Sequence, residues 1–233
     1  MDPKQLFVDQ RLIGMCVYCG GNPETSDHAP CKALLDDPLP NDLPVVDACN
    51  ECNRGFSSDE EFLACFLECV ICGTTDPSRL SRPKIARTLT ARPAIAALIS
   101  KCREDDLFGG ITWKPDLARV KNVVTKLARA HMAYELSLPK FDAPDIYDVC
   151  PHALMTPEQK AAFEEPVGEG IQPWPEIGSR AFVRACALWP EYQDNGWMVI
   201  QDGRYRYRVD QGPGGDAVRI VISEYLACLV AWA

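Results

Sequence analysis

The most specific pattern in this chain of 233 residues is Cys16-Val17-Tyr18-Cys19, then Thr25-Ser26-Asp27-His28-Ala29-Pro30, then Cys49-Asn50-Glu51-Cys52-Asn53. Each Cys-x-x-Cys pair offers two thiolates from a tight turn, and four thiolates complete the tetrahedral site of a structural zinc ion. One such pair alone would also fit redox-active or buried core cysteines. Because two pairs are present, we predict a structural zinc ion bound by Cys16, Cys19, Cys49 and Cys52.

The residues between and after the two cysteine pairs are unusual for a plain zinc ribbon. Asp27 supplies a hard oxygen ligand, and His28 supplies an imidazole that titrates near neutral pH. Asn53 adds a neutral oxygen and is held by its covalent neighbour Cys52. If zinc closes the loop, these three side chains converge on one side of it. A metal ion beside a base is suited to phosphodiester hydrolysis.

The order Cys-x-x-Cys, Asp-His-x-Pro, Asn/Asp-Leu, Cys-x-x-Cys-Asn over residues 14–62 resembles the HNH endonucleases, whose core is a ββα-metal finger. The resemblance implies that His28 is the general base and that Asp27 and Asn53 hold a catalytic Mg²⁺ or Mn²⁺ ion. For the residue that orients the loop carrying the base, the candidates are Asn41 and Asp42. It also implies products with 5′-phosphate and 3′-hydroxyl ends.

The charge of the chain is unevenly distributed. The net charge is −9, yet residues 76–132 contain 12 basic and 5 acidic side chains, whereas residues 1–75 contain 4 and 13. Local charge matters more for phosphate contact than the total does. The basic segment is either a set of solvated helix faces or a phosphate-binding region, and its position directly after the motif favours the second. We therefore predict that Arg119, Lys126 and Arg129, which share a helix face, contact DNA.

The cysteine content and hydropathy indicate the compartment. Twelve cysteines in a chain whose first 14 residues lack the features of a signal peptide favour metal binding and buried thiols over disulfides. No run of 18 apolar residues is present, so we expect no membrane partner. A reducing cytoplasm is the expected location. A homodimer remains an option.

We predict an α+β fold with three regions. Residues 1–75 form the zinc-stabilised region, which the resemblance implies is a ββα-metal (HNH) finger. Residues 76–138 form basic helices, and residues 139–233 form a linker with a small antiparallel sheet. A helix that begins near Cys49 is expected to end or break at Gly55, and a second to begin at Ser58. Further helices are expected at 83–90, 93–104 and 116–136 and after Thr156, and strands at 197–201, 205–209 and 218–222. Residues 225–232 fit a strand or a helix.

Three further groups have both a functional and a structural interpretation. Cys65, Cys69 and Cys72 resemble half of a second metal site, but their helical spacing favours packing in a core. His131 lies on an apolar stripe and is expected to be a core histidine. The alternating residues Arg204, Arg206 and Arg208 form either a nucleic-acid surface or the solvated side of a sheet.

The function that we expect is metal-dependent hydrolysis of DNA phosphodiester bonds. The alternative is a zinc-finger binding or adaptor protein that keeps the scaffold without catalysis. The acidic total charge and Phe56, which stands where many HNH enzymes carry Lys, favour this alternative. The presence of Asp27, His28 and Asn53 favours the nuclease.

Overall fold

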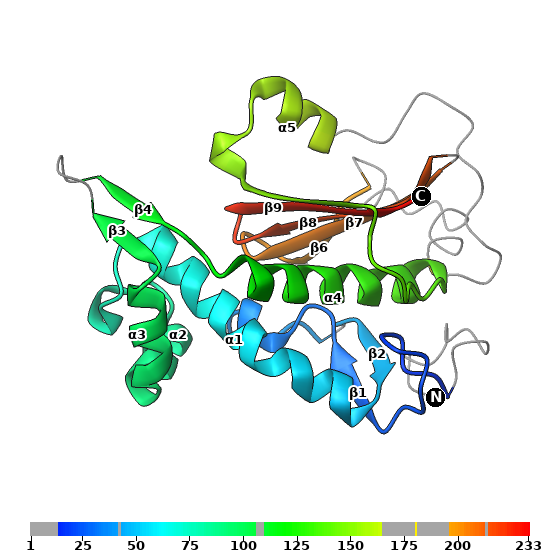
Figure 1. Ribbon diagram of the computed structural model, residues 1–233, viewed down its shortest axis with the longest axis horizontal. Coiled ribbons are helices and arrows are strands. Elements are labelled where there is room, and N and C mark those ends of the chain that lie inside the picture. The colour runs from blue at the N-terminus through cyan, green and yellow to red at the C-terminus, as the bar shows by residue number, and fades with distance from the viewer. Residues whose placement is uncertain (1–13, 42, 106–109, 165–179, 181–195, 213) are drawn as a thin grey trace. The chain divides into compact units, whose positions relative to one another are not determined.

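The computed structural model describes residues 14–41, 43–105, 110–164, 180, 196–212 and 214–233 (Figure 1). The chain forms two compact units, one made of residues 1–54 and 124–233 and the other of residues 55–123. These boundaries differ from the three consecutive regions that the sequence suggests, because helices α1 (Asn50–Cys72) and α4 (Leu117–Leu136) each run from one unit into the other.

A two-stranded hairpin and the first turn of α1 form the cysteine-rich part of the first unit. Strand β1 (Thr25–His28) pairs antiparallel with β2 (Val45–Ala48), in a register that places Asp27 opposite Val46. A short 3-10 helix, η3 (Lys32–Leu34), lies between the strands in sequence. The carboxylate of Glu24 accepts a hydrogen bond from the Asn50 N–H at 3.0 Å, where a negative charge is favourable at a helix N-terminus.

Helix α1 continues through Gly55, so the prediction of a break at this residue is wrong. A glycine inside a helix costs about 1 kcal/mol relative to alanine. Seven apolar residues in the following turns, from Phe62 to Leu67 and at Cys69, are buried. Because each buried apolar side chain contributes about 1.5–3 kcal/mol, their packing outweighs the cost of the glycine.

The larger part of the first unit is a five-stranded antiparallel sheet with the order β5-β9-β8-β7-β6. Its strands are β5 (Ile146–Pro151), β6 (Met198–Gln201), β7 (Tyr205–Gly212), β8 (Gly215–Ile222) and β9 (Leu226–Trp232). The three expected strands are confirmed, and residues 225–232 form a strand. Strand β5 was not predicted; its residues lie in the segment that was expected to be a linker.

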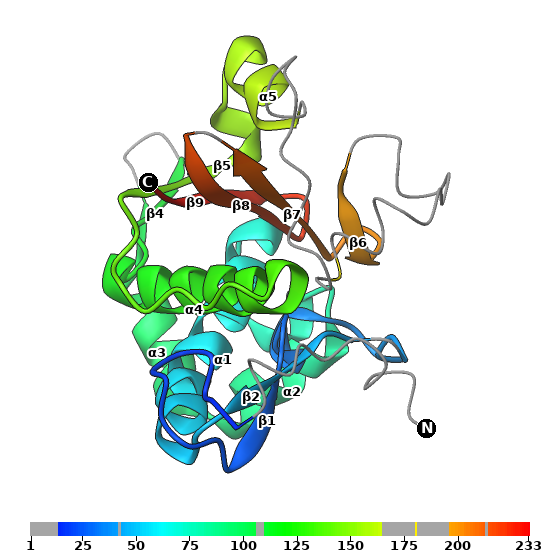
Figure 2. The same cartoon turned by 90° about the vertical axis from the view of Figure 1, so that its right-hand side faces the viewer.

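Helix α4 packs against one face of this sheet (Figures 1 and 2). His131 is fully buried there; its Nε2 lies 2.7 Å from the hydroxyl of Tyr205, and its ring stacks on Tyr207 with 3.6 Å between centroids. Tyr207 donates a hydrogen bond to Glu135. The prediction that His131 is a core residue is confirmed.

The opposite face of the sheet carries helix α5 (Pro157–Glu164), which follows the 3-10 helix η5 (His152–Leu154) (Figure 2). An apolar cluster lies beneath α5 and consists of Phe163, Trp197, Val221 and Ala227, with Met155 and Leu229 at its edge. Arg208 of β7 and Arg219 of β8 are directly paired on this face and are both buried. Asp210 separates their charges by binding Arg208 at 2.7 Å and Arg219 at 2.6 Å.

We expect Asp210→Ala to destabilise the sheet by about 3–5 kcal/mol, because it removes the carboxylate that binds two buried and directly opposed guanidinium groups. The matched control is Asp216→Ala on β8, whose carboxylate pairs with the partly exposed Lys140 and should contribute about 1 kcal/mol or less. Urea unfolding measures both as shifts of the midpoint. Equal shifts in the two variants would contradict the role given to Asp210.

The second unit contains the rest of α1 and the first turns of α4. Between them the described elements are η4 (Pro77–Arg79), α2 (Pro83–Ala91), α3 (Pro93–Ser100), β3 (Arg103–Asp105) and β4 (Ile111–Trp113). The hairpin β3–β4 was not predicted and shortens the helix that was expected to reach residue 104. None of the helices in the described residues is both long enough and apolar enough to cross a lipid bilayer.

Candidate functional site

The four predicted zinc ligands lie together. The sulfur atoms of Cys16, Cys19, Cys49 and Cys52 are all within 4.8 Å of one another, and those of Cys19 and Cys49 are 3.8 Å apart. Four thiolates around a zinc ion at 2.3 Å in a tetrahedron are about 3.8 Å apart. The donor set and its spacing therefore fit a zinc ion.

Backbone turns place these sulfur atoms. In the first turn the N–H of Cys16 donates to the carbonyl of Gly21 at 2.7 Å, and the N–H of Gly20 donates to the carbonyl of Cys16 at 2.8 Å. Gly20 has φ +76°, a conformation that glycine adopts without steric cost. In the second turn the N–H of Cys52 donates to the sulfur of Cys49 at 3.3 Å. Such N–H groups stabilise thiolates that bind a metal.

Burial and neighbouring groups shift the pKa values of the Cys16 and Cys52 thiols. Burial acts to raise the pKa of Cys16, but backbone hydrogen bonds from Cys49, Tyr18 and Cys19 outweigh it and lower that pKa. Burial, followed by hydrogen bonds to the neighbouring thiols, raises the pKa of Cys52. Four thiolates cannot gather here without a compensating cation. A bound zinc ion would supply this charge and displace the protons.

Arg129 lies beside the cysteine cluster rather than in a free surface position. Its Nη2 donates to the carbonyls of Phe141 and Asp142 at 2.8 and 2.9 Å, and its Nε is buried without a hydrogen-bond partner. Burial lowers the pKa of Arg129, while the charges of Asp142 and Cys52 act in the opposite direction. Its guanidinium is therefore occupied by a backbone loop and is electrostatically linked to Cys52.

The hairpin and α1 bring Asn53 next to the strand that carries Asp27 and His28. The amide of Asn53 donates to the carbonyl of Ser26 at 3.4 Å and to the hydroxyl of Thr25 at 3.5 Å. His28 ends strand β1 and is partly exposed. Because successive strand residues point to opposite faces, the buried Asp27 and the more accessible His28 face different surroundings.

Asp27 is enclosed by two partners that the sequence analysis did not connect to it. Its side chain is almost fully buried, and the same oxygen, Oδ2, accepts a hydrogen bond from the Tyr18 hydroxyl at 2.7 Å and binds the Lys126 ammonium at 2.7 Å. Lys126 is 1% exposed. This arrangement neutralises the carboxylate and places an ammonium on one oxygen of the predicted divalent-ion ligand.

The placement of Lys126 is incompatible with a phosphate contact, because its ammonium faces the interior. Its sequence context gives a signal for this: Lys126 lies between Val123, Val124, Leu127 and Ala130 on α4, and all four are fully buried. A lysine that is buried with such residues needs a counter-charge. The sequence does not show that Asp27 supplies it.

Arg119, the third predicted DNA contact, is engaged within the second unit. Its guanidinium binds Asp59 at 3.0 Å and Asp116 at 3.4 Å and lies 5.2 Å from the ring centroid of Phe62. A phosphate would have to compete with these contacts. Of the two candidates for orienting the loop, Asn41 is exposed in a turn and Asp42 lies outside the described residues.

Cys65, Cys69 and Cys72 do not form a second metal site. Within the described part of the chain, the only cluster of potential metal-binding residues is the four-cysteine cluster. Cys65 and Cys69 are fully buried, and burial raises the pKa of each thiol to about 12. Cys72 contacts Glu68 and Ser81, both at 3.4 Å. The prediction of core thiols is confirmed for Cys65 and Cys69, whereas Cys72 is only partly buried.

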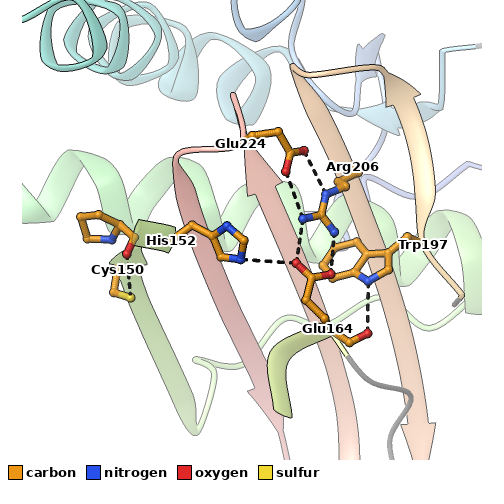
Figure 3. Close-up of polar contacts among 7 residues, drawn as sticks. Cys150, His152, Glu164, Trp197, Arg206 and Glu224 are labelled. Atoms are coloured by element: carbon orange, nitrogen blue, oxygen red, sulfur yellow. Dashed lines mark hydrogen bonds and ion pairs between the residues drawn. The ribbon is translucent and has the colours of Figure 1, made fainter. Parts of the chain in front are cut away.

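The three alternating arginines of β7 and the preceding turn are all paired with carboxylates. Arg204 binds Asp36 and Arg208 binds Asp210. Figure 3 shows Arg206 between Glu164 and Glu224, with two hydrogen bonds of 2.8 Å to Glu164. The hydrogen bonds from Arg206 lower the pKa of Glu164. Arg204 and Arg206 therefore connect the sheet to segments outside it, whereas Arg208 is paired within β7.

The surroundings of Glu164 complete this cluster (Figure 3). The ring of His152 lies 3.4 Å from Glu164, and the indole of Trp197 donates to the backbone carbonyl of Glu164 at 3.4 Å. The guanidinium of Arg206 lies 4.3 Å from the Trp197 ring centroid. Glu164, Arg206 and Glu224 are therefore bound to one another in this cluster. Comparisons with protein-family models, with curated proteins and with solved structures give no match to this chain.

Proposed function

We propose that this protein is an endonuclease of the HNH class that hydrolyses phosphodiester bonds in DNA. One observation carries the proposal: strand β1 with Asp27 and His28, strand β2 and the first turn of α1 with Asn53 follow one another in a ββα order that the four cysteines close. This is the order of elements that the resemblance implies. Zinc has a structural role in it and takes no part in the reaction.

His28 is the group that moves a proton. Its imidazole accepts the proton of a water molecule as the water oxygen attacks phosphorus, the bond to the 3′ oxygen breaks, and that oxygen takes up a proton from solvent. The position of His28 at the end of β1, where the residue is partly exposed, supports this role. The products then carry 5′-phosphate and 3′-hydroxyl ends, as the resemblance implies. No step is assigned to a divalent ion, because the ammonium of Lys126 binds the predicted ligand Asp27.

A second candidate function is supported by the same contact. A zinc-stabilised module that binds a partner without catalysis has no need of an open carboxylate, and Asp27 is buried with Tyr18 and Lys126. The ββα order, the zinc site and the charge distribution suit both functions. The two proposals differ in whether the chain breaks a phosphodiester bond.

Nicking of supercoiled plasmid separates the two functions. Zinc-loaded protein should convert supercoiled plasmid to open-circle and linear forms, and the assay is run in a divalent-free buffer with and without added Mg²⁺ or Mn²⁺. Withholding the ion is a cleaner control than EDTA, since chelators also remove structural zinc. Intact plasmid after incubation with folded, zinc-loaded protein and either ion would favour the binding module.

A further inference from the structure

Asp27, in the cysteine-rich part of the chain, forms a buried ion pair with Lys126. We propose that the ammonium of Lys126 is the resident cation of Asp27 and keeps Mg²⁺ and Mn²⁺ off this carboxylate. The inference deepens the proposed function, on which it rests for the assignment of Asp27 as the predicted metal ligand. It identifies Lys126 as the residue that controls divalent-ion binding at this strand.

The geometry of Asp27 leaves little room for a second cation. Oδ2 already receives two hydrogens, one from the Tyr18 hydroxyl and one from the ammonium, each at 2.7 Å between heavy atoms. A divalent ion on this oxygen would stand close to the positive ammonium in a water-poor environment, where like charges repel strongly. Metal binding to this carboxylate therefore competes with the ammonium.

Lys126 is held where it is by its surroundings. Its ammonium lies 5.8 Å from the ring centroid of Tyr18, so the aromatic ring and the carboxylate both stabilise the positive charge. Its side chain is buried among apolar residues of α4, and swinging out would leave Asp27 buried without a counter-charge. The closed arrangement is therefore strongly favoured over one open to metal.

Lys126→Met tests the proposal directly, because methionine keeps much of the side-chain volume and removes the charge. We expect zinc-loaded Lys126→Met to bind Mn²⁺ at least tenfold more tightly than the wild type, measured by the loss of the free Mn²⁺ signal in electron paramagnetic resonance. Mn²⁺ should also raise the melting temperature of Lys126→Met, since a ligand that binds only the folded state stabilises it. Neither measurement involves nucleic acid.

Two further variants test whether the gain in Mn²⁺ affinity depends on Asp27 and on the loss of Lys126 in particular. Lys126→Met combined with Asp27→Asn should lose the gain in Mn²⁺ affinity, because the amide lacks the negative charge. Lys140→Met, which removes an ion-paired lysine from the same unit, should behave like the wild type. Equal affinity of wild type and Lys126→Met, or a gain that survives Asp27→Asn, would overturn the proposal.

The proposal can also be tested without Lys126→Met, which matters if that variant does not fold. If Lys126 excludes metal from Asp27, Asp27→Asn alone should leave the Mn²⁺ affinity of the otherwise native protein unchanged. A tenfold loss of affinity in Asp27→Asn would show that Asp27 binds metal despite Lys126 and would overturn the proposal. An inactive protein in the plasmid assay would contradict the proposed function without affecting either metal measurement.

Discussion

Cys49→Ala should remove zinc and unfold the hairpin β1–β2 together with the first turn of α1. Structural zinc sites contribute on the order of 10–16 kcal/mol in small peptides, which is as large as the net stability of a typical domain, about 5–15 kcal/mol. Elemental analysis should find close to one zinc ion per wild-type chain and almost none in the variant. Hydrogen exchange should show loss of protection in residues 16–53.

The matched control for this variant is Cys228→Ala. Cys228 is fully buried in β9 of the same unit but lies outside the zinc cluster. Its replacement removes one sulfur atom from the core and should leave zinc content and hairpin protection unchanged. A well-folded wild-type protein without zinc, or a Cys49→Ala variant that retains one zinc ion, would contradict the assignment.

His28→Ala should lower the rate of plasmid cleavage by about 10²- to 10⁴-fold, the usual contribution of a general base. Because His28 is partly exposed and does not bind zinc, the zinc content and melting temperature should change little. Single-turnover nicking rates give the chemical step, and elemental analysis verifies that the metal is retained.

His152→Ala provides the control for the loss of an imidazole, since His152 of η5 lies next to Glu164 of α5 and outside the four-cysteine cluster. This variant should cleave at the wild-type rate. Cleavage by His28→Ala at the wild-type rate would exclude His28 as the base. A fall in rate of similar size in both variants would point to a general loss of folded protein instead.

The sequence predicts the elements whose spacing is regular. Helix α4, the four cysteines and the strands on either side of Asp202-Gly203 follow from local patterns, because apolar periodicity and turn residues act within a few positions. Strand β5 could not be predicted in this way. Its residues pair only with β9, about 80 positions later in the chain, and pairing over such distances leaves no local pattern.

The sequence predicts the four cysteines of the candidate zinc site but not the contacts of the residues that surround it. Cys16 and Cys49 fall in short motifs that define a zinc site, so their spacing is enough to identify them. Lys126 and Arg129 were predicted to face DNA because helical spacing places them near Arg119 on one side of α4. Spacing gives the side of a helix but not what covers it. Lys126 turns inward to Asp27, and Arg129 is bound by the carbonyls of Phe141 and Asp142, which follow α4 in the chain.

The division of the first unit into residues 1–54 and 124–233 has a consequence for the order in which the protein assembles. The zinc loop joins Cys19 to Cys49 across 30 positions, whereas the contact of Asp36 with Arg204 spans 168. Closing the longer loop costs about 1.5 kcal/mol more in chain entropy. On a ribosome, the zinc loop is complete long before the sheet residues have been synthesised. We therefore expect nascent chains to acquire zinc first and to leave Asp27 without its lysine until α4 emerges.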